Sequence, residues 1–162
     1  MNADSFTSPE IRQLRSRLEE EGGYGHALLS SLAANPVCTV QIEETIPCLR
    51  VTWKRYVTSV QLRYVHECLL ELLVRHGCAK ILGVDTLLPS ISGDDQRWIA
   101  EDWLPRARAA GLKVVANKSS DSYFARIAVD SVLKSFRPFV DVRSFDDLER
   151  AREWLKTAQI AS

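Results

Sequence analysis

The sequence predicts an α/β fold, with a mixed and mainly parallel sheet of about five strands and helices packed around it. Three observations carry this prediction. A long amphipathic helix over residues 58–76 leads directly into a short apolar strand over residues 79–85. Alternating apolar residues over residues 38–53 indicate an antiparallel hairpin before that helix. Helix and strand patterns then alternate to the end of the chain, which predicts right-handed crossovers and parallel strands beyond the hairpin.

Length and charge bound the class of protein. The 162 residues suffice for one domain with a sizeable core, and Lys plus Arg equals Asp plus Glu at 21 each. Nucleic-acid-binding proteins usually show a basic excess, so this balance gives no sign of a nucleic-acid partner. The start of the chain lacks the basic and apolar regions of a signal peptide, and no apolar run reaches the ~20 residues that span a bilayer. We therefore expect a cytoplasmic protein without a membrane span.

The four cysteines, at positions 38, 48, 68 and 78, are widely spaced and form no C-x-x-C pair. This spacing argues against a zinc site. In a reducing compartment we expect them to be core thiols that pack as small hydrophobic side chains. The sequence leads us to expect no metal and no other cofactor.

The N-terminal segment begins with a strong helix start. Ser8 can cap the helix, and Pro9 suits its first position. The helix carries one thin apolar stripe and ends at two glycines. Such a stripe buries little area, so this helix either lies across the domain or meets a partner chain. We divide the chain into an N-terminal helix and connector over residues 1–36 and an α/β domain over residues 37–162.

The predicted hairpin follows the connector. Three apolar residues of its first strand share one side, namely Cys38, Val40 and Ile42, and three of its second strand do the same, namely Leu49, Val51 and Trp53. A period of two with one buried face is typical of antiparallel strands.

The next helix is the best defined element. Thr58 and Gln61 form a capping box at its start, and Gly77 is a left-handed stop at its end. Between them an apolar stripe recurs at helical spacing, formed by Val65, Cys68, Leu69, Leu72 and Leu73. The strand over residues 79–85 follows at once and ends in an acid, Asp85.

The second half repeats the alternation. A helix is expected to begin near Ser92 and to carry Trp98, Ile99, Trp103 and Leu104, with Pro105 kinking or breaking it. A strand over residues 112–116 follows. The next helix, capped by Asp121 or Ser122, is expected to turn inward Phe124, Ile127, Ala128, Val132 and Leu133. A short strand over residues 139–142 leads to a closing helix, with a capping box between Ser144 and Asp147.

These features resemble the SpoIIAA-like, or STAS-like, protein family over about Val37 to Lys156. The resemblance is spread over many positions: the hairpin ending in Trp53, the strand Ile81–Asp85, Trp98 and Trp103 before Pro105, the segment Gly111–Ala116, and the closing Phe145, Ala151, Trp154 and Leu155. It implies a compact sheet with helices around it and a regulatory role. Some proteins of this type resemble lipid-carrying CRAL–TRIO domains.

One departure from the family concerns phosphorylation. The anti-sigma-factor antagonists of this family carry an Asp-Ser-x-Gly motif after the central strand, and its Ser is phosphorylated. The corresponding stretch here, Ser90–Gly93, places Ile91 at the acceptor position. A phosphoserine switch of that kind is therefore in doubt. Thr86, Ser90 or Ser92 could replace that Ser, but capping and turn roles explain these residues equally well.

Motifs of catalysis are missing from the sequence. It has no G-x-G-x-x-G turn, no G-x-x-x-x-G-K loop, no G-x-S-x-G elbow and no H-E-x-x-H pair. His66 is interpreted as a partly buried polar residue rather than a general base. Asp85 is more informative, because open α/β sheets place ligands at the carboxyl ends of their strands. The alternative is that it accepts N–H groups of its own loop. We predict no enzyme.

The candidate site is the loop that follows Asp85. Its residues are expected to contact a partner or ligand, and they are Asp85, Thr86, Leu87, Leu88, Ile91, Ser92 and Trp98. Exposed apolar residues would mark a contact surface. Alternatively, Leu87, Leu88 and Ile91 fold back under Trp98 and close the core. The tryptophans likewise either fill the core or line a pocket.

Two functions follow from these alternatives. The first is a non-enzymatic regulatory or protein-interaction module of STAS type, which binds another protein or itself as a homodimer. The second is a binding module for an apolar or lipid-like small molecule, as in CRAL–TRIO domains. A large apolar cavity would favour the second function, and a flat exposed apolar loop would favour the first.

Overall fold

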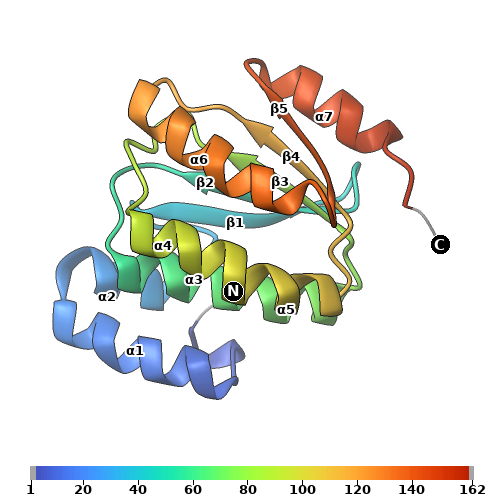
Figure 1. Ribbon diagram of the computed structural model, residues 1–162. Helices are drawn as coiled ribbons and strands as arrows, with labels where there is room; N and C mark the ends of the chain where they lie inside the picture. The colour runs from blue at the N-terminus through green and yellow to red at the C-terminus, as the bar shows by residue number, and fades with distance from the viewer. Residues whose placement is uncertain (1–2, 161–162) are drawn as a thin grey trace.

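The computed structural model describes residues 3–160, and it confirms the predicted fold class. Five strands form one sheet in the order β1-β2-β3-β4-β5, with β1 antiparallel to β2 and the other neighbours parallel (Figure 1). Their bounds are β1 (Cys38–Glu43), β2 (Cys48–Trp53), β3 (Lys80–Val84), β4 (Val114–Lys118) and β5 (Asp141–Phe145).

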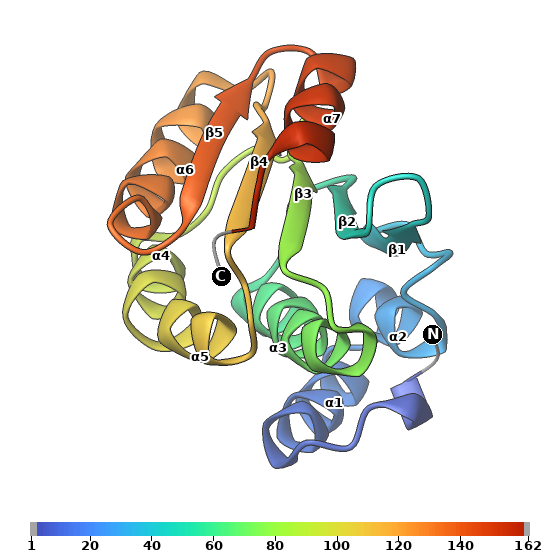
Figure 2. The same cartoon turned by 90° about the vertical axis from the view of Figure 1, so that its right-hand side faces the viewer.

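Helices cover both faces of the sheet. One face is covered by α3 (Ser59–His76), α4 (Gly93–Trp98), η2 (Ile99–Trp103), α5 (Leu104–Ala109) and α6 (Tyr123–Phe136). The other face is covered only in part, by α7 (Leu148–Thr157), as Figure 2 shows. The N-terminal η1 (Ala3–Ser5), α1 (Pro9–Glu21) and α2 (Gly23–Ser30) complete the described elements.

The predicted signals of α3 are confirmed. The Thr58 side chain accepts from the backbone N–H of Gln61, the Gln61 side chain accepts from that of Thr58, and Gly77 ends the helix in the left-handed conformation with φ of 60°. The apolar stripe faces the sheet, and Leu69, Leu72 and Leu73 are buried. This helix is therefore the main cover of the central strands.

The N-terminal helix α1 packs against α3 on its outer side, away from the central strands, and α2 packs against α1 (Figure 2). Ile11 and Leu18 are fully buried and belong to the same hydrophobic cluster as α3. Glu21 also accepts hydrogen bonds from both capping residues, Thr58 and Gln61. Of the two alternatives for this helix, the structure has it lying across the domain.

The segment around Pro105 differs from the prediction. The chain stays helical from Gly93 to Ala109, and the turns before the proline widen into the π-helix η2. Within it, the Leu104 N–H donates to the Ile99 carbonyl, five residues back. Proline has no N–H to give and its ring crowds the preceding turn, so a wider turn accommodates it without breaking the helix.

The C-terminal helices also correct two details. Phe124 and Ile127 are 74% and 52% exposed, so the inward face predicted for α6 was wrong at these positions. The predicted inward positions Ala128, Val132 and Leu133 are confirmed, and the buried side of the helix also includes Ala125, Val129 and Phe136. Ser144 lies in β5, and Asp147 alone caps α7 by accepting from the Arg150 N–H, so the predicted Ser144–Asp147 capping box does not form.

Candidate functional site

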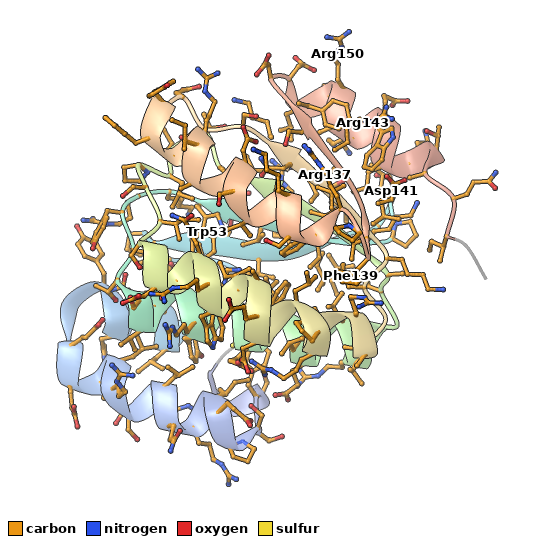
Figure 3. The ribbon with its side chains drawn as sticks, viewed as in Figure 1. Trp53, Arg137, Phe139, Asp141, Arg143 and Arg150 are labelled. Atoms are coloured by element: carbon orange, nitrogen blue, oxygen red, sulfur yellow. The ribbon has the colours of Figure 1, made fainter. Side chains whose placement is uncertain are left out.

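A cavity lies between the sheet and the helices α3, η2 and α6. Its volume is about 100 Å³, and most of its lining side chains are aliphatic or aromatic. Trp53, at the end of β2, is one of them, and Figure 3 shows it between the sheet and α4. A second hollow of about 120 Å³ shares Leu62 and Ile91 with this cavity and is also lined by the exposed Tyr56.

Two parallel strands bring polar side chains to the cavity. Asp85 follows β3 directly, and Asn117 lies near the end of β4, paired in register with Gly83. The carboxyl ends of parallel strands share one edge of the sheet, which is where such folds place ligands. Gly83 lets both side chains approach the strand closely, because a Cβ on it would lie only 3.3 Å from Asn117 Oδ1 and 3.9 Å from Asp85 Oδ1.

Both of these polar side chains are buried without a partner in the described protein. Asp85 is 6% exposed and Asn117 is 4% exposed. Within residues 3–160, neither side chain makes a hydrogen bond or an ion pair. Burial raises the pKa of Asp85 to about 7, although the charge of the nearby Lys118 acts in the opposite direction.

His66 is the third polar group of the cavity. Its Nδ1 lies 2.9 Å from the Leu62 carbonyl oxygen, which can only accept, so Nδ1 carries the proton and the neutral ring keeps a lone pair on Nε2. Trp53 stacks on the ring with centroids 6.0 Å apart, and Trp103 meets it edge-on at 4.9 Å. These apolar surroundings lower the pKa of His66 to about 4.

The π-helix shapes the roof of the cavity. Ile99 and Trp103, its first and last residues, both line the space. The Trp103 Nε1–H donates to the His66 carbonyl oxygen at 2.7 Å, which fixes the indole against α3. Single π turns within helices are frequent at functional sites.

The structure divides the predicted site residues into three groups. Three of them line the cavity, namely Asp85, Leu88 and Ile91. Trp98 meets the His66 ring edge-on at 6.0 Å, and Ser92 caps α4 and donates to Asp95. Leu87 is 61% exposed, and the Thr86 carbonyl accepts from the Asp121 N–H.

Hydrogen bonds hold the loop after β3 against the loop after β4. Ser120 Oγ donates to the Leu88 carbonyl at 2.6 Å, and Ser122 Oγ donates to the Pro89 carbonyl at 2.9 Å. Leu88 is only 2% exposed as a result. Of the two alternatives for this loop, Leu88 follows the one in which it folds inward, whereas Leu87 stays at the surface.

Sequence reasoning missed Asn117, Gly83 and the place of His66 in the site. The strand containing Asn117 was expected to end at Ala116, whereas β4 continues to Lys118. A usable signal was present, because Asn117 is the first polar residue after a buried apolar run, as Asp85 is in the preceding strand. The position of His66 beneath Trp53 depends on how α3 crosses the sheet, which no local pattern shows.

Other kinds of site find no support in the part of the chain that the structure describes. Residues 3–160 contain no group of three or more His, Cys, Asp or Glu side chains that could hold a metal ion. No helix in that range is long and apolar enough to cross a membrane. Comparison with protein-family models gives no match, and comparison with curated proteins gives none either.

Proposed function

We propose that this protein is a non-enzymatic binding module for a small, mostly apolar molecule. The observation that carries the proposal is the pair of buried side chains, Asp85 and Asn117, that face an apolar cavity without a partner among residues 3–160. Ligand sites are typically apolar hollows with a few polar groups that orient the ligand. The resemblance to CRAL–TRIO-like proteins points the same way.

A purely structural role explains this pair less well. A buried polar group without a hydrogen bond costs roughly 1–3 kcal/mol in proteins. Asp85 and Asn117 lie on neighbouring strands beside Gly83, and neither side chain has a hydrogen-bond partner in residues 3–160. A ligand that satisfies both groups would offset this cost.

Toluene is a suitable first probe, because it tests the cavity without any polar contact. We expect millimolar toluene to raise the melting temperature, since a ligand that binds only the folded state stabilises it. Val115→Ile adds a methylene at the cavity and should weaken this effect several-fold. Val114→Ile is the matched control, because Val114 is buried on the opposite face against α7.

The control decides how a negative result is understood. If toluene leaves the melting temperature of the native protein unchanged, the cavity does not take apolar molecules and the proposal is wrong. If Val114→Ile and Val115→Ile weaken the effect equally, toluene binds elsewhere or to the whole fold.

A second candidate function, self-association, is favoured by the free edge of β5. The alternate residues Val142 and Ser144 direct their backbone groups away from β4, because Asp141 and Phe145 make the bonds to it. Figure 3 shows Asp141 and Arg143 along this strand beside α7. If two copies pair antiparallel through β5 with Val142 opposite Val142, Asp141 of each copy lies opposite Arg143 of the other. The contact would then contain two ion pairs. This contact would suit a homodimer with the regulatory role that the family resemblance implies.

Charge reversal tests this second candidate. Asp141→Arg alone should weaken the dimer, because it places two cations opposite each other, and the swap Asp141→Arg with Arg143→Asp should restore it. Sedimentation equilibrium measures the association. Glu19→Arg, at an exposed position of α1, is the control. A native protein that is monomeric at high micromolar concentration would remove this candidate.

A further inference from the structure

Two side-chain oxygen atoms lie close to Gly83, and this is the most informative feature of the cavity. Asn117 Oδ1 and Asp85 Oδ1 lie 3.3 and 3.9 Å from the point that a Cβ would occupy. No side chain of residues 3–160 donates to either oxygen. A ligand group in the cavity beside Gly83 that carries several N–H bonds would therefore face both oxygens.

The remaining polar atoms of the cavity also favour a donor on the ligand. His66 offers the Nε2 lone pair, since its proton is on Nδ1. Asn117, which also lines the cavity, carries a neutral amide donor besides its Oδ1. The nearest cation, Lys118, does not line the cavity: its Nζ donates to the Ser119 carbonyl and lies 3.8 Å from Asp121. An anionic ligand would therefore meet a carboxylate without a compensating cation.

The walls indicate the shape of the ligand. Trp53, Trp103 and Phe136 contribute aromatic rings, and Trp103 and Phe136 stack with centroids 6.3 Å apart. A dry cavity of ~150 Å³ is known to hold benzene. This cavity, at about 100 Å³, is smaller than that benzene site, so a ligand within it has at most one ring. Aromatic faces also attract cations.

We propose that the ligand is a small aromatic amine or amidine, whose cationic group binds over Gly83 between Asp85 and Asn117 and whose ring packs among Trp53, Trp103 and Phe136. This proposal rests on the proposed small-molecule function and specifies its ligand class. In this arrangement the Asp85 carboxylate supplies the negative charge that pairs with the ligand cation. Asn117 Oδ1 is a neutral acceptor for its N–H groups.

Binding of such a cation should depend on pH. Burial raises the pKa of Asp85 to about 7, and a bound cation favours the ionised carboxylate, so the affinity should rise as the pH rises through 7 and level off above it. The charged and titratable groups nearby are Lys118 and Asp121 outside the cavity and His66 within it. His66 stays neutral in this range because its pKa is about 4.

A series of one-ring probes with different head groups tests the ligand class. Benzylamine, benzyl alcohol, toluene and benzoate are titrated separately into the full chain at pH 8 by isothermal calorimetry. We expect benzylamine to bind at least tenfold more tightly than toluene, benzyl alcohol to fall between them, and benzoate to bind weakest. At pH 5.5 we expect the affinity for benzylamine to be several-fold lower than at pH 8.

Two variants locate the head group. Asp85→Asn keeps the shape of the side chain and should remove the preference for benzylamine over toluene together with its pH dependence. Gly83→Ala fills the space over the strand and should weaken benzylamine more than toluene. Melting temperatures confirm that both variants fold.

The outcomes separate this proposal from the one on which it rests. Equal affinities for toluene and benzylamine, or a preference for benzoate, would overturn the cationic ligand while the binding function stands. Benzylamine that binds unchanged to Asp85→Asn would also overturn it. Failure of every probe, toluene included, would overturn both.

Discussion

At the scale of single residues, Asp85 makes stability depend on pH in an unusual direction. Its pKa is about 7 in the folded protein, against 3.8 for an ordinary Asp, because burial disfavours the carboxylate. Between these two pH values the folded chain holds a proton that the unfolded chain has lost. The contribution of Asp85 to the free energy of unfolding therefore falls as the pH rises through this window, and it is constant above it.

Asp85→Asn isolates this effect, because the amide stays neutral at every pH. We expect the variant and the native protein to melt at similar temperatures at pH 4, and the variant to melt higher at pH 8. Circular dichroism melts at the two pH values measure the difference. A variant that melts lower at pH 8 would mean that the carboxylate has a stabilising partner in solution.

At the scale of elements, α7 depends on a buried lysine. Lys80, at the start of β3, is 6% exposed, and its Nζ donates to the carbonyl oxygens of Leu155 and Ala158 at 2.6 and 2.8 Å. These carbonyls belong to the end of α7, where no helical N–H can reach them. The lysine thus ties the end of this helix to the central strand beneath it.

Lys80→Met should remove this tie while keeping most of the side-chain volume. We expect a loss of about 1–3 kcal/mol in the free energy of unfolding, because two carbonyls lose their donor. Urea melts give the value. Lys134→Met, at an exposed position of α6, should change stability by less than about 0.5 kcal/mol.

Elements with local signals were predicted well, and those that depend on distant contacts were not. The caps at Ser8 and Thr58 lie within a few residues of the groups they satisfy, so sequence spacing reveals them. The inward face of α6 was wrong at Phe124 because apolar residues occupy more than one side of that helix. The site was found in part: Asp85 was predicted from its strand end, whereas its neighbour Asn117 requires the register between β3 and β4.

At the scale of the whole molecule, the division at residue 36 remains a prediction. Phe6, Ile11 and Leu18 are nearly or fully buried in the cluster that also holds α3. Removing residues 1–23 would expose that face of α3 and forfeit roughly 1.5–3 kcal/mol for each buried side chain. We expect the truncated protein to unfold at a much lower urea concentration than the full chain. An unchanged midpoint would show that residues 24–162 fold independently of α1.

The four buried cysteines make local opening measurable without any engineered label. Cys38, Cys68 and Cys78 lie in the cluster on the α3 side of the sheet, whereas Cys48 lies in the smaller cluster under α7. Burial raises the pKa of Cys48 to about 12, so a thiol reagent attacks it appreciably only when this smaller cluster opens. Because that cluster is small and α7 lies near the chain end, Cys48 should be modified faster than Cys68 under native conditions. Mass spectrometry of quenched reactions would then measure the local opening around Cys48 separately from opening of the rest of the protein.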